Sequence, residues 1–242
     1  MPDSPTILQK VAAWGVHLFT ASGLLTGYLS LLAVGRGDWQ AAALWLLAGQ
    51  LIDGVDGTLA RAFRVREVLP GVDGKLIDYV IDFANYAIIP AYFIHRAVPL
   101  PPGWEWPVVA LILLVSALYY GIEEMVSTDY YFVGFPVMWN MVAFYLVFLW
   151  HWSPVWNAVL IAIFAVLHFV PVKFPYPSRA TRFRPLHLAV SATFLINLVL
   201  LILQYPSPQP VVQALAWLTA AYYAGMAMYE TWFISRAETP GH

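Results

Sequence analysis

The sequence predicts an all-α fold, a polytopic transmembrane helix bundle with about eight spans and both termini in the cytoplasm. Three observations support this: an apolar composition, eight long apolar segments, and a one-sided distribution of Lys and Arg. Of the 242 residues, 61% are hydrophobic and 11% are charged, against roughly 25% charged residues in an average soluble domain. The mean hydropathy is +0.68. Because a globular core of this length cannot bury so much apolar surface, most of the chain must face lipid or lie inside a bundle.

A helix that crosses the bilayer needs about 20 predominantly apolar residues. The candidate segments are 11–35, 39–61, 75–96, 106–122, 137–152, 154–172, 186–204 and 210–233. The fifth and sixth are short and meet at His151–Pro154, so six or seven spans remain an alternative. No small-residue cleavage site follows the first apolar segment, which we expect to be a retained helix. Without repeats or a change in composition, residues 1–242 are expected to form one domain.

Eight spans place both termini on one side of the membrane, and the basic residues indicate which side. Ten of the twelve Lys and Arg residues fall on the side of the termini: Lys10, Arg61, Arg64, Arg66, Lys75, Lys173, Arg179, Arg182, Arg184 and Arg236. Only Arg36 and Arg96 fall on the other side. The positive-inside rule makes the first side cytoplasmic. Trp104 and Trp106 then lie outside, as an interfacial anchor.

The composition also limits the chemistry. The chain has no cysteine, which excludes disulfides, thiolate metal ligands and a cysteine nucleophile. The net charge is −2, and no nucleic-acid partner is expected.

Four aspartates stand out against this apolar background. Asp53 and Asp56 are spaced i, i+3 in one predicted helix, and Asp78 and Asp82 are spaced i, i+4 in the next. Each pair therefore lies on one face of its helix. The connection at 62–74 makes the two helices antiparallel neighbours, so the four carboxylates are expected to converge at the cytoplasmic end of the pair.

Carboxylates inside apolar helices cost several kcal/mol unless they are paired or bind a cation. Four oxygen ligands without His or Cys suit hard divalent ions such as Mg²⁺, Mn²⁺ or Ca²⁺. Two such ions can bind the attacking and leaving oxygens of a phosphoryl transfer. The alternative is that the aspartates are loop acids that pair with nearby Arg and Lys, while the adjacent glycines serve close helix packing.

The motif Asp53-x2-Asp56-Gly57-x2-Ala60-Arg61, followed by Gly74-x3-Asp78-x3-Asp82, resembles the signature of the CDP-alcohol phosphotransferases at every position. Twelve residues separate its two halves, more than in the commonest form of the signature. The resemblance implies that a hydroxyl attacks the phosphate that joins CDP to its alcohol or lipid, and that CMP leaves. It also implies a homodimer.

The resemblance implies a role for each matched residue. Asp53, Asp56, Asp78 and Asp82 would bind the metal, as two ions of Mn²⁺ or Mg²⁺, and Asp82 would also be the general base. The CDP-binding residues would be Asp53, Asp56, Gly57, Ala60, Arg61, Gly74 and Asp78.

Three further stretches resemble the bacterial phosphatidylcholine synthase branch of this family: 16–23, 129–140 and 171–185. This resemblance implies that CDP-diacylglycerol is the donor, free choline the acceptor, and the inner membrane of a bacterium the location, with the active site at the cytoplasmic face. Sister enzymes that use serine, glycerol-3-phosphate or inositol phosphate are the nearest alternatives. A cation transporter is a more remote one, because transport sites usually lie near the bilayer midplane in repeat-built folds.

A quaternary ammonium group is usually held by aromatic faces and a nearby anion. Candidates for choline binding are Tyr79, Tyr86, Glu123, Glu124, Trp139 and Asn140. Each aromatic residue also has the ordinary interpretation of an interfacial side chain. Arg179, Arg182 and Arg184 are candidates for a phosphate or a lipid headgroup. His17 and Thr20, on one face of the first helix, border the nucleotide pocket in one interpretation and bond a neighbouring helix in the other.

Overall fold

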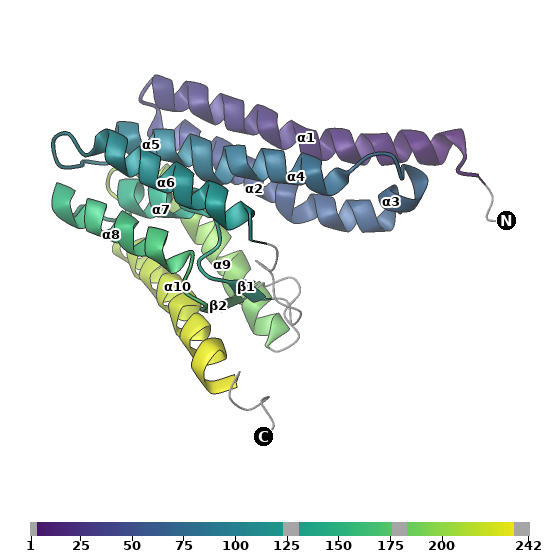
Figure 1. The fold of residues 1–242 in the computed structure, drawn as a ribbon. Coiled ribbons are helices and arrows are strands. Elements are labelled where there is room, and N and C mark those ends of the chain that lie inside the picture. Colours follow the sequence, from purple (N-terminus) through teal and green to yellow (C-terminus); the bar gives the residue numbers. More distant parts are fainter. Residues whose placement is uncertain (1–3, 123–130, 176–182, 235–242) are drawn as a thin grey trace. The chain divides into compact units, whose positions relative to one another are not determined.

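The structure, a computed structural model, describes residues 4–122, 131–175 and 183–234. The chain divides into two compact units, Met1–Ala97 and Val98–His242, here called the N-terminal and the C-terminal unit. Figure 1 shows that the described parts of both are built almost entirely of helices.

The N-terminal unit contains five α-helices and one π-helical turn. They are α1 (Ile7–Gly35), α2 (Trp39–Ala62), α3 (Val65–Val68), α4 (Gly74–Phe83), η1 (Ala84–Ile88) and α5 (Ile89–Ala97). Three of the helices begin at a side-chain cap. Thr6 forms a capping box with Gln9 at the start of α1, while Asp38 and Asp73 accept backbone N–H bonds at the starts of α2 and α4. Such caps satisfy N–H groups that have no partner inside the helix.

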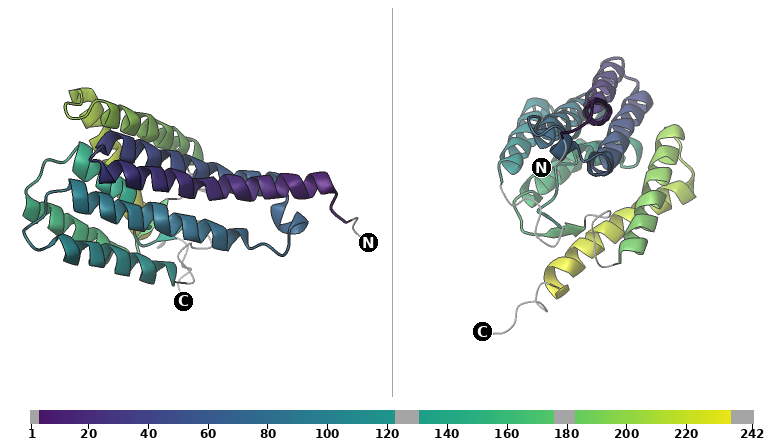
Figure 2. Two further views of the ribbon diagram at one scale, coloured as in Figure 1. Left: turned by 90° about the horizontal axis from the view of Figure 1, so that it is seen from above. Right: turned by 90° about the vertical axis from the view of Figure 1, so that its right-hand side faces the viewer.

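Small residues allow the helices of this unit to approach closely. The buried face of α1 includes Gly23, Gly27 and Ser30, and the Ser30 hydroxyl donates a 2.8 Å bond to the carbonyl of Ala42 on α2. Small residues and interhelical hydrogen bonds are the usual means of association between membrane helices. Helices α4, η1 and α5 follow one another without a break and run beside α1 (Figures 1 and 2).

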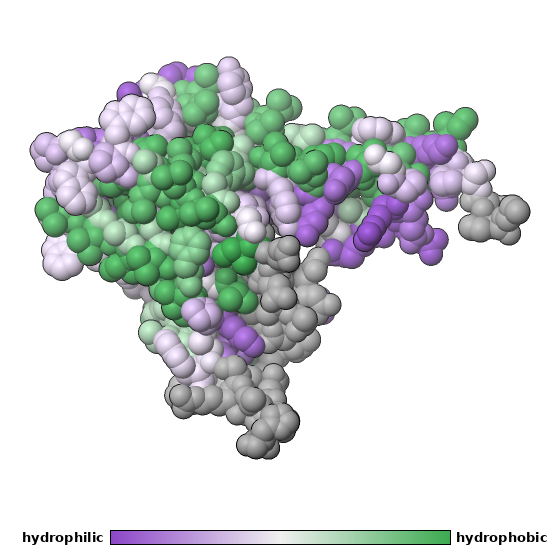
Figure 3. Space-filling view, viewed as in Figure 1, coloured by the Kyte–Doolittle hydropathy of each residue, from purple (hydrophilic) through white to green (hydrophobic). Residues whose placement is uncertain are grey.

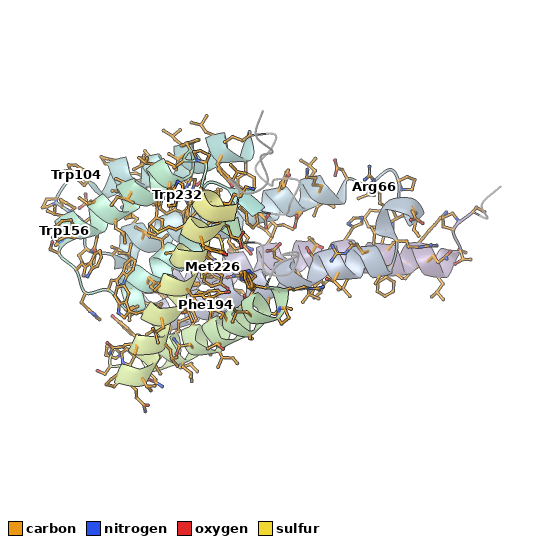
Figure 4. All side chains as sticks on the ribbon, turned by 90° about the horizontal axis from the view of Figure 1, so that it is seen from below. Arg66, Trp104, Trp156, Phe194, Met226 and Trp232 are labelled. Carbon is orange, nitrogen blue, oxygen red and sulfur yellow. The ribbon has the colours of Figure 1, made fainter. Side chains whose placement is uncertain are left out.

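The N-terminal unit is polar at one end. The helix ends next to α3 carry exposed charged residues, among them Arg61, Arg64, Arg66 and Lys75. Figure 3 shows hydrophilic side chains gathered around this end, and Figure 4 shows Arg66 there. This is the end that the basic residues predict to face the cytoplasm.

The C-terminal unit contains α6 (Glu105–Tyr120), α7 (Trp139–Phe148), α8 (Pro154–Leu167), α9 (Arg184–Leu203), α10 (Pro210–Tyr229) and the π-helical turn η2 (Glu230–Ile234). Two short strands, β1 (Tyr131–Val133) and β2 (Lys173–Pro175), pair antiparallel, with Phe132 opposite Phe174. Exposed Trp104 and Trp156 lie at the same end of this unit (Figure 4).

Each of the eight apolar segments predicted from the sequence contains a helix. Among the described residues, four helical stretches are long and apolar enough to cross a membrane: Ile7–Gly35, Gly74–Ala97, Arg184–Leu203 and Pro210–Trp232. Helix α2 is 24 residues long but carries two aspartates and an arginine in its second half. The helical membrane fold is therefore confirmed, whereas the number of spans and the side of the termini stay predictions. The two short strands were not expected from the sequence.

Candidate metal centre

Three of the four predicted aspartates converge in the N-terminal unit. Asp53 on α2 and Asp78 and Asp82 on α4 each present a carboxylate oxygen, and these oxygens lie within 4.8 Å of one another. All three side chains are partly buried. Two residues on one turn of α4 and a third on its neighbour thus form the cluster, as the i, i+4 spacing predicts.

Asp56, the fourth aspartate, is placed differently. It is 8% exposed, and it lies beside the side chain of Thr20 on α1 in the wall of a shared cavity. The other three aspartates line the same small cavity. The empty volume of this cavity is about 170 Å³, and its walls are Thr20, Gly23, Gly49, Ile52, Asp53, Asp56, Asp78, Ile81 and Asp82.

The donor set fits a hard divalent cation. Carboxylate oxygens this close repel one another strongly in a poorly solvated site, and no described Lys or Arg forms an ion pair with any of the four aspartates. The one ion pair seen in the described part of the chain joins Arg64 and Glu67 at 3.6 Å. The alternative that these acids simply pair with basic loop residues therefore finds no support in the described residues.

The predicted CDP-binding residues lie on the helix ends next to the aspartates. Ala60 packs against the apolar cluster of Ala13, Val16, Val65 and Val68. Arg61 is exposed, and its guanidinium donates a 3.1 Å bond to the Thr58 hydroxyl. An added side chain at Gly57 would meet this guanidinium at 3.4 Å. Gly74 begins α4 and faces the ring of His17, where an added Cβ would lie 3.0 Å from Cε1.

The choline-binding candidates belong to different units of the chain, Tyr79 and Tyr86 to the N-terminal unit and Trp139 and Asn140 to the C-terminal unit. The Lys75 ammonium lies 5.1 Å from the centre of the Tyr79 ring. Trp139 is fully buried in the C-terminal unit, where its indole N–H donates to Ser116 at 2.9 Å, and Asn140 beside it is equally buried. Glu123, Glu124, Arg179 and Arg182 fall outside the described residues, and Arg184 is exposed at the start of α9.

Two features of the site were not predicted from the sequence. The Tyr86 hydroxyl donates a 2.8 Å hydrogen bond to Oδ2 of Asp53, whereas the sequence indicates Tyr86 as a candidate for choline binding or for an extension of the Asp78–Asp82 face that lines the cavity. His17, which was expected to border the nucleotide pocket or to bond a neighbouring helix, is 7% exposed, and its Nε2 has no hydrogen-bond partner among the described residues. The spacing of Tyr86 four residues after Asp82 is the signal that places it on the aspartate face.

Several known proteins of similar sequence carry the same name. A phosphatidylcholine synthase of Pseudomonas aeruginosa is 42% identical over 235 residues, which is 95% of this chain and 98% of the relative. The chain belongs to the phosphatidylcholine synthase family. Another phosphatidylcholine synthase, from Legionella pneumophila, is 36% identical over 94% of this chain and 92% of its own length. A third, from Rhizobium meliloti, is 34% identical over 84% of both chains. No family model matches the sequence.

The similarity to these phosphatidylcholine synthases extends over both units. An alignment that covers 95% of this chain includes most of Val98–His242 as well as the aspartate cluster. The cluster therefore belongs to a chain whose full length resembles enzymes of one name.

Proposed function

We propose that this membrane protein is a CDP-alcohol phosphotransferase that transfers the phosphatidyl group of CDP-diacylglycerol to the hydroxyl of choline and releases CMP. The observation that carries the proposal is the cluster of Asp53, Asp78 and Asp82 inside a chain of the phosphatidylcholine synthase family. Membership of the family supports choline as the acceptor, and the donor set supports a divalent metal.

The four aspartates have two roles in the proposed reaction, metal binding and proton transfer. Asp53, Asp56, Asp78 and Asp82 would hold two ions of Mn²⁺ or Mg²⁺, which supply positive charge for the diphosphate and acidify the bound hydroxyl. Asp82 accepts the hydroxyl proton of choline as its oxygen forms a bond to the phosphorus of the phosphatidyl group. The bond from this phosphorus to the oxygen of CMP breaks, and CMP leaves with the electron pair. Asp82 then returns its proton to water.

The surroundings of the aspartates suit this reaction. The helix ends that carry Gly57, Ala60 and Gly74 lie beside the carboxylates and would bind the nucleotide. The four aspartates line one small cavity, and the nucleotide and the lipid extend beyond it. We place the active site at the cytoplasmic face of a bacterial inner membrane, because the polar end of the N-terminal unit carries the basic residues. A homodimer and a single domain over residues 1–242 are part of the same proposal.

The test is release of CMP by the purified protein with CDP-diacylglycerol and Mn²⁺, with choline, serine, glycerol-3-phosphate and inositol phosphate offered separately. Release with choline alone, together with formation of phosphatidylcholine, is the expected result. Release with another acceptor would keep the aspartate chemistry and reject choline. Failure with every acceptor, in a folded sample that binds Mn²⁺, would reject the transferase.

A further inference from the structure

The hydroxyl of Tyr86 contacts the aspartate cluster directly. It donates a 2.8 Å bond to Oδ2 of Asp53, and the tyrosine is 7% exposed. A hydrogen bond to a charged acceptor is stronger than a neutral one. It therefore restricts rotation of the carboxylate and determines how Asp53 presents its oxygens to the cluster.

The direction of the Tyr86 side chain follows from helix geometry. Side chains on an α-helix tilt toward the N-terminus of the helix, and Tyr86 follows Asp82 by four residues. A long side chain at position 86 therefore reaches back over the preceding turn, to the level of Asp82. Since α2 and α4 are antiparallel, Asp53 lies at this same level on the facing helix.

Two consecutive residues of the π-helical turn η1 contact two different helices. Asn85 and Tyr86 both lie in this turn, and both are buried. Asn85 faces α1, where its Nδ2 donates a 2.9 Å bond to the carbonyl of Gly23, while Tyr86 faces Asp53 on α2. Single π-helical turns inside α-helices are frequent at functional sites.

Glycines on the neighbouring helices fix the position of Asn85. A Cβ at Gly27 would overlap the Asn85 side-chain oxygen, and one at Gly49 would lie 3.1 Å from its Nδ2 and 2.7 Å from the Thr26 hydroxyl. The asparagine is thus held between α1 and α2. Because Tyr86 follows it in the same turn, the bond of Asn85 to α1 also holds the backbone that directs the tyrosine hydroxyl to Asp53.

We propose that Tyr86 is a positioning residue of the metal centre, whose hydroxyl holds the Asp53 carboxylate in the orientation that binds the ion. This inference rests on the proposed function, since it requires that the cluster binds a divalent metal. It differs from the interpretation of Tyr86 as a wall of the choline pocket, because the hydroxyl is the group required. Phenylalanine at position 86 separates the two, since it keeps the aromatic face and removes the bond to Asp53.

The experiment is titration of the purified full-length protein with Mn²⁺, followed by electron paramagnetic resonance of the free ion. Tyr86→Phe is expected to weaken Mn²⁺ binding by about 10- to 100-fold, the usual effect of losing a group that orients a metal ligand. The matched control is Tyr92→Phe on α5, whose ring stacks on His95 in the same unit, and it should bind Mn²⁺ as the wild type does. At saturating Mn²⁺, the KM for choline of Tyr86→Phe should equal that of the wild type.

A double-mutant cycle tests the route through Asp53. Once Asp53 is replaced by Asn, Tyr86→Phe should weaken Mn²⁺ binding no further. Wild-type Mn²⁺ affinity in Tyr86→Phe would overturn the inference, and a raised KM for choline with unchanged Mn²⁺ binding would replace it with the choline wall. Absence of Mn²⁺ binding by the wild-type protein would instead reject the metal centre, and this inference with it.

Discussion

Both units of the chain bury polar side chains that bond individually to a neighbouring helix, and among the described residues only the N-terminal unit also gathers several acidic side chains. In the C-terminal unit, buried polar groups bond individually to neighbouring helices: Tyr145 donates to the carbonyl of Ala216 at 3.0 Å, and Asn197 donates to that of Val212 at 3.0 Å. In the N-terminal unit, three carboxylates of the same charge gather within 4.8 Å. A buried polar residue in a membrane bundle is therefore not a sign of chemistry by itself.

A single buried hydrogen-bond donor and a group of carboxylates change the free energy of the folded state in opposite directions. A buried donor that finds a backbone carbonyl lowers the free energy of the folded state by a modest amount. Gathered carboxylates raise it until a cation binds. If this comparison is correct, the two kinds of substitution should differ. Removing a carboxylate from the cluster should lower activity and make the metal-free protein more stable. Removing a hydroxyl from the C-terminal unit should lower stability and leave activity unchanged.

The largest effect is expected from Asp82→Asn. An amide of nearly the same shape cannot accept the proton of choline, so CMP release should fall by about 10³-fold or more, given that general bases contribute roughly 10²- to 10⁴-fold. The matched control is Asp73→Asn, because Asp73 caps α4 through two backbone bonds that asparagine also accepts. Retention of a tenth of the activity by Asp82→Asn would show that another group takes the proton.

Removal of the metal should lower stability as well as activity. A ligand present at 100 times its Kd stabilises the folded state by about 2.7 kcal/mol, so EDTA should lower the thermal midpoint of the wild-type protein, and Mn²⁺ should restore it. Asp78→Asn should show the reverse in the metal-free state, since one carboxylate fewer reduces the repulsion. A metal-free Asp78→Asn protein less stable than the metal-free wild type would contradict the repulsion that we infer.

The sequence predicted the aspartate cluster better than the side chains that contact it. The i, i+3 and i, i+4 spacings and the short connection 62–74 place carboxylates on facing sides of two adjacent helices, and this holds for Asp53, Asp78 and Asp82. The position of Asp56 beside Thr20 depends on how α1 packs against α2. The spacing of Tyr86 four residues after Asp82 indicates the aspartate face, but the bond of its hydroxyl to Asp53 depends on how α2 and α4 pack, and the π-helical turn that contains Tyr86 leaves no signal in the sequence. Periodicity assumes a constant 3.6 residues per turn and therefore misses such a turn.

The two strands of the C-terminal unit could not be predicted from the sequence either. The strands β1 and β2 have three residues each, too few for an alternating pattern to appear among apolar neighbours. They pair Tyr131 with Pro175 across a long separation in the chain, and such pairing is decided by tertiary packing.

A smaller effect is expected where a glycine of α1 is filled. Gly27→Ala would place a Cβ against Asn85, and overpacking of this kind costs about 1–3 kcal/mol. It should also weaken Mn²⁺ binding, because Asn85 holds the turn that carries Tyr86. Gly15→Ala on the same helix has no atom within 4 Å of the new Cβ and should be neutral or slightly stabilising. Thermal unfolding in detergent measures stability, and Mn²⁺ titration measures metal affinity. If Gly27→Ala and Gly15→Ala gave the same results, close contact between Gly27 and Asn85 would not be required for either property.

The smallest effect tests the C-terminal unit. Tyr145→Phe removes the bond to the carbonyl of Ala216 and keeps the ring, which stacks near Phe194. Loss of one such bond should lower the free energy of unfolding by about 0.5–1.5 kcal/mol, and the KM for choline and the affinity for Mn²⁺ should stay unchanged. This is the converse of Tyr86→Phe, in which the same atom is removed from a tyrosine that contacts a carboxylate. A drop in Mn²⁺ affinity for Tyr145→Phe would show that the polar groups of the C-terminal unit also determine the state of the metal centre, and the contrast between the units would fail.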